Sequence, residues 1–252
     1  MIEIEWHNLK AYELRERAAQ DAILIVPCGS TEQHGPHLPV QVDALLATEV
    51  SKRAARLVAE EAPVVVAPTV WCGLAEHHMA LGGTITLDHA TYHALLRCVC
   101  RSAVRHGFRR ILLMNGHGGN INALNVIAGE LSVELGAPIA TGTYWTITGI
   151  AKAFREILEK QENVRHAGEA ETSMLLALRP DLVDQEAMRT VEADQVALVG
   201  PTGIYRYRSF ADITPAGVIG VPSAASAKKG ERLLEAAGRE LARAILSGGV
   251  WG

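Results

Sequence analysis

Short apolar runs alternate along this chain with longer segments of mixed polarity. Four of the runs are brief, and the first is continuous, as parallel strands are when both faces of their sheet are covered. They occupy residues 22–28, 63–67, 111–114 and 138–145. The pattern predicts a mainly parallel sheet, with functional loops at the carboxyl ends of its strands.

Other segments carry apolar residues at three- or four-residue steps, which predicts helices. The expected helices span residues 11–19, 43–60, 88–107, 174–178 and 227–246, and another ends near Leu135. Residues 181–226 show little periodicity and are expected to form strand-like arms and loops, a candidate subunit contact. The order of elements predicts an α/β fold, a single three-layer domain over residues 1–252 with helices flanking the sheet.

Composition narrows the class of protein. A chain of 252 residues, 48% of them apolar, is sufficient for one large domain. The net charge of −4 gives no electrostatic reason to expect nucleic acid or a membrane as a partner. The sequence shows no secretory signal, no apolar run of membrane-spanning length and no zinc-ribbon spacing among its four cysteines. A cytoplasmic protein with free thiols is therefore expected.

The loop after the first predicted strand is rich in potential metal ligands. It reads Gly-Ser-Thr-Glu-Gln-His-Gly-Pro-His-Leu-Pro and contains Glu32, His34 and His37, with Asp43 shortly after it. A catalytic metal site needs such ligands beside an open position for water. The alternatives are a polar loop with capping histidines and, for Asp43, a helix N-cap.

A glycine-rich turn, Asn-Gly-His-Gly-Gly-Asn, follows the third strand at residues 115–120. A phosphate-binding loop is disfavoured because the turn has no lysine and lacks the full Gly-x-Gly-x-x-Gly spacing. The glycines are better explained as allowing a tight turn that presents His117 to the same edge of the sheet. Asn120 is a candidate cap for the next helix.

A third polar cluster, His-Ala-Gly-Glu-Ala-Glu-Thr-Ser, begins at His166 and precedes an apolar helix. Glu169 and Glu171 cannot share one helical face, so their roles should differ. An acidic first helical turn accounts for one glutamate but not for the whole set. Two further segments are pocket candidates: the loop with Glu76, His77 and His78, and Trp145, which suits either substrate stacking or the core.

Together the three motifs resemble the creatininase (creatinine amidohydrolase) family, in the same order and over nearly the whole chain. The resemblance implies an α/β fold with a dinuclear metal centre at the carboxyl edge of a mainly parallel sheet. Members hydrolyse carbon–nitrogen bonds in cyclic amides and formamides, and a relative trims a peptide. Known members often assemble as hexamers, built as trimers of dimers.

Carried over by position, the resemblance implies that Glu32, Asp43 and His117 hold one divalent ion, and that His34 and a bridging Asp43 hold another. The ions could be zinc, manganese or iron. Creatininase completes the second site with a glutamate at the position that is Gly119 here, and we expect Glu169 to replace it. His166 matches the proton-shuttling histidine, and Glu171 is expected to orient it.

A second departure concerns the substrate. Creatininase has a tryptophan–aspartate pair that closes over creatinine, where this chain has Glu162 and Asn163. We therefore expect an amidohydrolase that uses a water activated by two metals to cleave a small cyclic amide or formamide, rather than creatinine. Trp145, Gly118, Glu76 and His77 are the expected substrate-binding residues. Alternatives are a lactone-opening hydrolase with the same metals and a catalytically silent homologue.

Overall fold

The computed structural model describes residues 2–191 and 206–251. Four parallel strands form one sheet in the order β2-β1-β3-β4. The strands are β1 (Ile23–Cys28), β2 (Val64–Val66), β3 (Arg110–Asn115) and β4 (Ile139–Thr143). In register, Ile25 pairs with Val66 on one side and with Leu112 on the other. The predicted parallel sheet is therefore confirmed.

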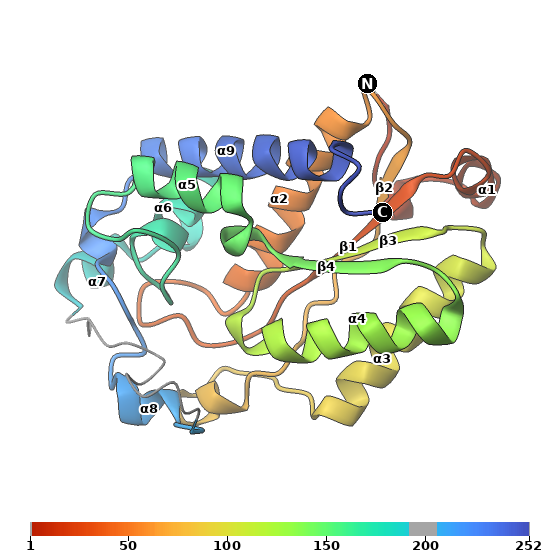
Figure 1. Cartoon of the computed structure of the whole chain (residues 1–252). Helices are drawn as coiled ribbons and strands as arrows, with labels where there is room; N and C mark the ends of the chain where they lie inside the picture. The colour runs from red at the N-terminus through yellow and green to blue at the C-terminus, as the bar shows by residue number, and fades with distance from the viewer. Residues whose placement is uncertain (1, 192–205, 252) are drawn as a thin grey trace.

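Helices cover both faces of the sheet, so the single α/β domain has three layers (Figure 1). One face carries α2 (Val42–Val58), α5 (Thr148–Ile157), α6 (Glu169–Leu178) and the long α9 (Ala227–Leu246). The other face carries α1 (Ala11–Ala19), α3 (His89–Arg105) and α4 (Ile121–Leu135). Two short helices, α7 (Gln185–Thr190) and α8 (Phe210–Ile213), lie between α6 and α9 in the sequence.

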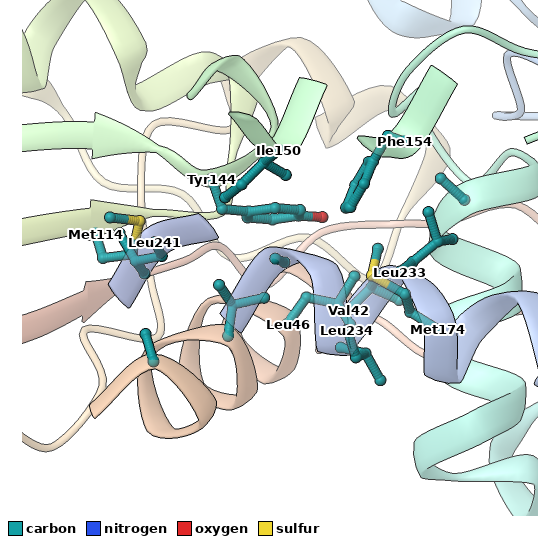
Figure 2. Packing of buried hydrophobic residues seen from close by; sticks show 14 of the residues in the cluster. Val42, Leu46, Met114, Tyr144, Ile150, Phe154, Met174, Leu233, Leu234 and Leu241 are labelled. Atoms are coloured by element: carbon teal, nitrogen blue, oxygen red, sulfur yellow. The ribbon is translucent and has the colours of Figure 1, made fainter. Parts of the chain in front are cut away.

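The strand residues divide strictly between the two faces. In β1, Ile23 and Ile25 belong to the core under α2 and α9, whereas Leu24 and Val26 belong to the core over α3 and α4. This alternation explains why β1, β2 and most of β3 are continuously apolar, because both faces of these strands are buried, whereas the edge strand β4 is partly exposed and less apolar. Figure 2 shows the first core, where side chains of α9 pack against residues from α2, α6 and the strand ends.

Two expectations from the sequence need correction, and one helix was missed. Residues 181–226 hold α7, α8 and 3-10 turns where they are described, not strand-like arms, and residues 192–205 lie outside the described part. Helix α6 begins at Glu169 rather than near Met174, because the polar motif is itself its first turns. The amphipathic α5 was not predicted. Within the described ranges, no helix combines the length and the hydropathy that crossing a membrane requires.

Candidate metal centre

Buried polar side chains gather at the carboxyl ends of β1 and β3. Glu32 and His34 lie in the loop after β1, and His117 follows β3 by two residues. Asp43 and Glu171 come from the first turns of α2 and α6. All five are at most 3% exposed, although burying an uncompensated carboxylate is costly. The buried carboxylates of this cluster therefore need a positive charge close by to compensate them.

Asp43 lies at the centre of this cluster. The N-cap of α2 is Gln41, and Asp43 lies inside the first turn, so the N-cap alternative for Asp43 is wrong. The main chain of α2 reaches the site because Gly116 has no side chain. A Cβ at Gly116 would stand 2.6 Å from the Asp43 carbonyl oxygen and 2.9 Å from Ala47 Cβ. The glycine after β3 thus lets the helix start and His117 approach each other.

The first ligand group comprises Glu32, Asp43 and His117. His117 Nδ1 lies 2.9 Å from Asp43 Oδ2 and 2.9 Å from Glu32 Oε2. The other ring nitrogen, Nε2, lies 3.1 Å from the carbonyl oxygen of Leu74. When Nε2 donates its hydrogen to this carbonyl, Nδ1 of the neutral ring offers a lone pair to a metal, as is usual for ligating histidines.

The second ligand group comprises His34, Asp43 and Glu171. His34 Nε2 lies 3.2 Å from Asp43 Oδ1 and 3.6 Å from Glu171 Oε2. Its Nδ1 lies 3.1 Å from the carbonyl oxygen of Glu32, which again leaves the inward nitrogen to bind a metal. Glu171 is oriented by the amide of Ala167, which donates to Oε2 at 2.7 Å.

The residues present fit two divalent cations. Ligand atoms of each group lie within 4.8 Å of one another, and Asp43 is common to both groups. Glu32 Oε2 and His34 Nε2 are buried yet make no hydrogen bond to any described residue. A set of imidazoles and carboxylates suits zinc, manganese or iron. A third group, Glu32, His34 and His166, places His166 beside the same cluster.

The charges of the cluster are strongly interdependent. Burial raises the pKa of Glu171 to about 8, although His34 opposes this effect. Burial lowers the pKa of His34, but the carboxylates of Asp43, Glu171 and Glu32 together outweigh burial and raise the pKa to about 9. Histidines that hold protons between carboxylates occupy the place of cations, so metal binding here must release protons.

Glu169 does not join the ligand groups, which corrects the expected ligand. It starts α6 but points to the side opposite Glu171, because two residues along a helix turn by about 200°. Lys229 Nζ donates to Glu169 Oε1 at 2.7 Å, and the backbone amides of Glu159 and Lys160 donate to the carboxylate at 2.9 and 2.8 Å. Its charge is already compensated by the protein.

The resemblance leads us to expect a ligand glutamate at the position of Gly119, and the structure explains the glycine. A Cβ at this position would collide with His117 Nε2 and the Leu74 carbonyl and would lie 2.8 Å from His77 Cε1. The hydrogen bond that orients His117 therefore occupies the space that a side chain would need. A carboxylate for the second group has to come from elsewhere, and Glu171 is the one that lies there.

Of the expected substrate-binding residues, His77 and Gly118 lie beside His117, whereas Glu76 and Trp145 make their contacts with other residues. His77 stacks on His117 with ring centroids 5.6 Å apart, and Gly118 is exposed beside His117. Glu76 is exposed, and its backbone carbonyl rather than its carboxylate accepts a hydrogen bond from Tyr207. Trp145 is half-buried and packs edge-on against Tyr144.

Two polar residues that looked like a ligand and a cap have other partners. His37 lies within hydrogen-bond distance of Thr172, with its Nε2 3.0 Å from the hydroxyl oxygen. Asn120 stands at the N-cap position of α4 as expected, but its side chain binds the Gly29 carbonyl and the Leu74 amide and makes no capping hydrogen bond.

The sequence alone did not single out Gln33 and Phe210, and it gave His78 only as one residue of a candidate pocket loop. Gln33 Nε2 lies 2.8 Å from His78 Nδ1 and 3.0 Å from His166 Nε2. The Phe210 ring packs on His78 at 4.1 Å and on His166 at 4.7 Å. The adjacent histidines at 77 and 78 were a signal for His78, but Phe210 lies far along the chain and no motif marks it.

A parallel α/β domain with buried imidazoles and carboxylates converging at its strand ends defines a hydrolase class with a candidate binuclear metal site. The chain belongs to the creatininase family: the family model described as creatinine amidohydrolase matches residues 7–245. A solved structure described as a mutant creatininase of Zn–Zn type matches with a TM-score of 0.79 at 29% identity, over 98% of both chains.

Curated relatives carry three different activities in their names. Creatinine amidohydrolase of Pseudomonas putida is 33% identical over 262 residues, covering 96% of this chain and 94% of that protein. A mycofactocin precursor peptide peptidase of Mycobacterium ulcerans (strain Agy99) is 32% identical and covers 83% and 79%. The 3-dehydro-scyllo-inosose hydrolase of Thermotoga maritima (strain ATCC 43589 / DSM 3109 / JCM 10099 / NBRC 100826 / MSB8) is 30% identical and covers 92% and 79%.

Proposed function

We propose that this chain is a metal-dependent amidohydrolase that cleaves a carbon–nitrogen bond in a small cyclic amide or formamide other than creatinine. The observation that carries the proposal is the pair of ligand groups that share Asp43. Glu32, Asp43 and His117 would hold one ion, and His34, Asp43 and Glu171 would hold the other. When bound, the two ions supply a nucleophile from water near neutral pH and polarise the substrate carbonyl.

His166 is the proposed proton donor to the leaving nitrogen. Its Nδ1 lies 3.6 Å from Glu32 Oε1, and its ring centroid lies 4.2 Å from that of His34. His166 Nε2 lies 2.9 Å from the backbone carbonyl oxygen of Gln33, which can accept a hydrogen bond. It also lies 3.0 Å from the side-chain amide nitrogen of Gln33, which can donate one. Glu171 would act as a ligand instead of orienting His166. Burial, followed by the charges of His34 and His78, lowers the pKa of His166, which favours release of a proton that the ring has taken up.

The substrate is proposed from what surrounds the cluster. Glu162, at the position of the lid tryptophan in creatininase, has a side chain that is 83% exposed, and Asn163 donates to the Trp145 carbonyl at 2.9 Å. Neither residue supplies an aromatic lid for creatinine. His77, Gly118 and Trp145 remain the proposed substrate contacts. The differing names of the relatives also favour a wide screen over creatinine alone.

A ring-opening hydrolase of a substrate without an amide is the second candidate. One relative is named for 3-dehydro-scyllo-inosose, which supports including lactones and cyclic ketones in the screen. Loss of His166 separates the two functions, because an alkoxide leaves more readily than an amine. His166→Ala should abolish amide turnover and largely spare lactone turnover.

The first experiment is elemental analysis of protein purified without added metal, joined to turnover assays with amides, formamides, lactones and creatinine. Two metals per chain and turnover of a non-creatinine amide are expected. Fast creatinine turnover would overturn the substrate assignment. Absence of bound metal after reconstitution would favour a silent homologue. Light scattering on the same sample tests the hexamer that the resemblance implies.

A further inference from the structure

Gln33 has a side-chain orientation that its neighbours determine. Its Oε1 accepts a hydrogen bond from the backbone amide of Gly35 at 2.9 Å. The backbone amide can only donate, so the reversed orientation of the Gln33 amide would set two donors against each other. The Nε2 group, which carries two hydrogens and cannot accept, therefore faces His78 Nδ1 at 2.8 Å.

This orientation determines the tautomer of His78. Because Gln33 Nε2 donates, His78 Nδ1 must accept, and a neutral imidazole with a bare Nδ1 carries its hydrogen on Nε2. That Nε2 lies 3.2 Å from Glu32 Oε1. The ring is buried and is held between His77 at 4.3 Å and Phe210 at 4.1 Å, measured between ring centroids.

The two oxygens of Glu32 therefore have different surroundings. Oε1 faces His78, whereas Oε2 makes no hydrogen bond to any described residue and lies 2.9 Å from His117 Nδ1. We propose that His78 is a positioning residue that donates from Nε2 to Glu32 Oε1, in a tautomer imposed by Gln33, and so reserves Glu32 Oε2 for the metal. The inference rests on the proposed metal centre and adds a specific outer contact to it.

The test is the affinity of the full-length, metal-free protein for Zn²⁺, measured by competition with a chromophoric chelator. His78→Leu removes the donor and should weaken one of the two sites about 10- to 100-fold, as loss of an outer partner does. His78→Gln can place an amide donor near Glu32 and should restore most of the affinity. Unchanged affinity in His78→Leu would overturn the inference.

Two comparisons exclude a general loss of structure. His37→Leu removes another buried imidazole, from the loop that carries Glu32, and this imidazole belongs to none of the metal-capable groups among the described residues. It should lower the melting temperature and leave Zn²⁺ affinity within about twofold. Equal weakening by His37→Leu and His78→Leu would show that the loss is not specific to the contact with Glu32, and would reject the proposal.

The dependence on Gln33 is tested by a double-mutant cycle. Gln33→Met keeps the size of the side chain but cannot donate to His78. If the two residues act as one chain, adding His78→Leu to Gln33→Met should weaken Zn²⁺ binding little further. Multiplicative effects would contradict the imposed tautomer. A wild-type protein that binds no Zn²⁺ would instead refute the proposed function itself.

Discussion

Helix α6 carries two buried glutamates that meet opposite surroundings. Glu169 accepts a hydrogen bond from Lys229, whose ammonium also lies 3.1 Å from Glu159, and two backbone amides complete its shell. Glu171 faces Asp43 and His34 and receives one backbone amide, from Ala167. The first residue belongs to an ion cluster that the protein closes by itself, and the second belongs to the ligand cluster.

The difference shows how a buried carboxylate reveals its role. A buried charge persists when it is paired or bound to a metal, because desolvation would otherwise neutralise it. In the ion cluster the cation is a side chain. The ligand cluster contains three carboxylates, those of Glu32, Asp43 and Glu171. In the metal-capable groups found among the described residues, their only possible cationic partners are histidine rings. Stability is therefore expected from the first cluster and chemistry from the second.

Replacing Asp43, the residue common to both ligand groups, should have the largest effect on metal binding and turnover. Asp43→Asn takes a charge from both ligand groups and should leave less than one metal per chain. Turnover of the amide found in the screen should fall by about 10³-fold, the equivalent of several kcal/mol of transition-state stabilisation. Asp88→Asn, which alters an exposed helix cap, is the control and should keep both metals. Two metals in Asp43→Asn would refute the bridging role.

The two glutamates of α6 can be exchanged for glutamine one at a time. Glu171→Gln should lose one of two metals and keep the fold, because Ala167 can still donate to the remaining carbonyl oxygen. Glu169→Gln should keep both metals. Elemental analysis after dialysis distinguishes the variants. Loss of a metal in Glu169→Gln alone would restore the assignment that the sequence suggested.

Breaking the ion cluster should affect folding instead of chemistry. Lys229→Met leaves Glu169 buried without its cation, which should lower the free energy of unfolding by about 3 kcal/mol, near the lower end for a broken buried pair. Two backbone amides still hold the carboxylate, so the larger values are not expected. Urea unfolding measures the change. The variant should still bind two metals, and a loss of either would show that the clusters are not independent.

The sheet and most helices were predictable because their signals are local. Short runs rich in apolar residues gave all four strands, and the expected bounds of α1 and α9 match the observed ones. The start of α6 was less predictable, since its first turns carry polar residues whose burial depends on distant partners such as Lys229. Short helices α7 and α8 have too few residues to show a period.

The ligand cluster was predictable in part for the same reason. Glu32, His34, Asp43 and His117 stand in motifs at strand ends, where the topology of a parallel sheet makes them meet. Choosing between Glu169 and Glu171 required the rotation of α6 and the position of Lys229, neither of which a motif encodes. Gln33 and His78 are 45 residues apart in the sequence and come within hydrogen-bond distance only in the folded chain. The sequence alone therefore could not predict that they interact.

The smallest effect concerns two buried tyrosines on opposite faces of the sheet. Tyr144 lies in the core that includes α2, α6 and α9, and its hydroxyl makes no hydrogen bond to any described residue (Figure 2). Its pKa is raised by burial and then by the charges of Glu171 and Asp43, so its dipole senses the ligand cluster. Burial also raises the pKa of Tyr92, but the neighbours that raise it further are the thiols of Cys28 and Cys72, not the ligand carboxylates.

Tyr144→Phe and Tyr92→Phe each delete one buried hydroxyl without changing the ring. Each should raise the free energy of unfolding of the metal-free protein by about 1 kcal/mol, since burying an unsatisfied hydroxyl costs roughly that much. Only Tyr144→Phe should also alter Zn²⁺ affinity, by a few-fold, because only its hydroxyl interacts with ligand carboxylates. Chelator competition on both variants measures this. Equal Zn²⁺ affinities in the two variants would show that the Tyr144 hydroxyl does not influence metal binding by the ligand cluster.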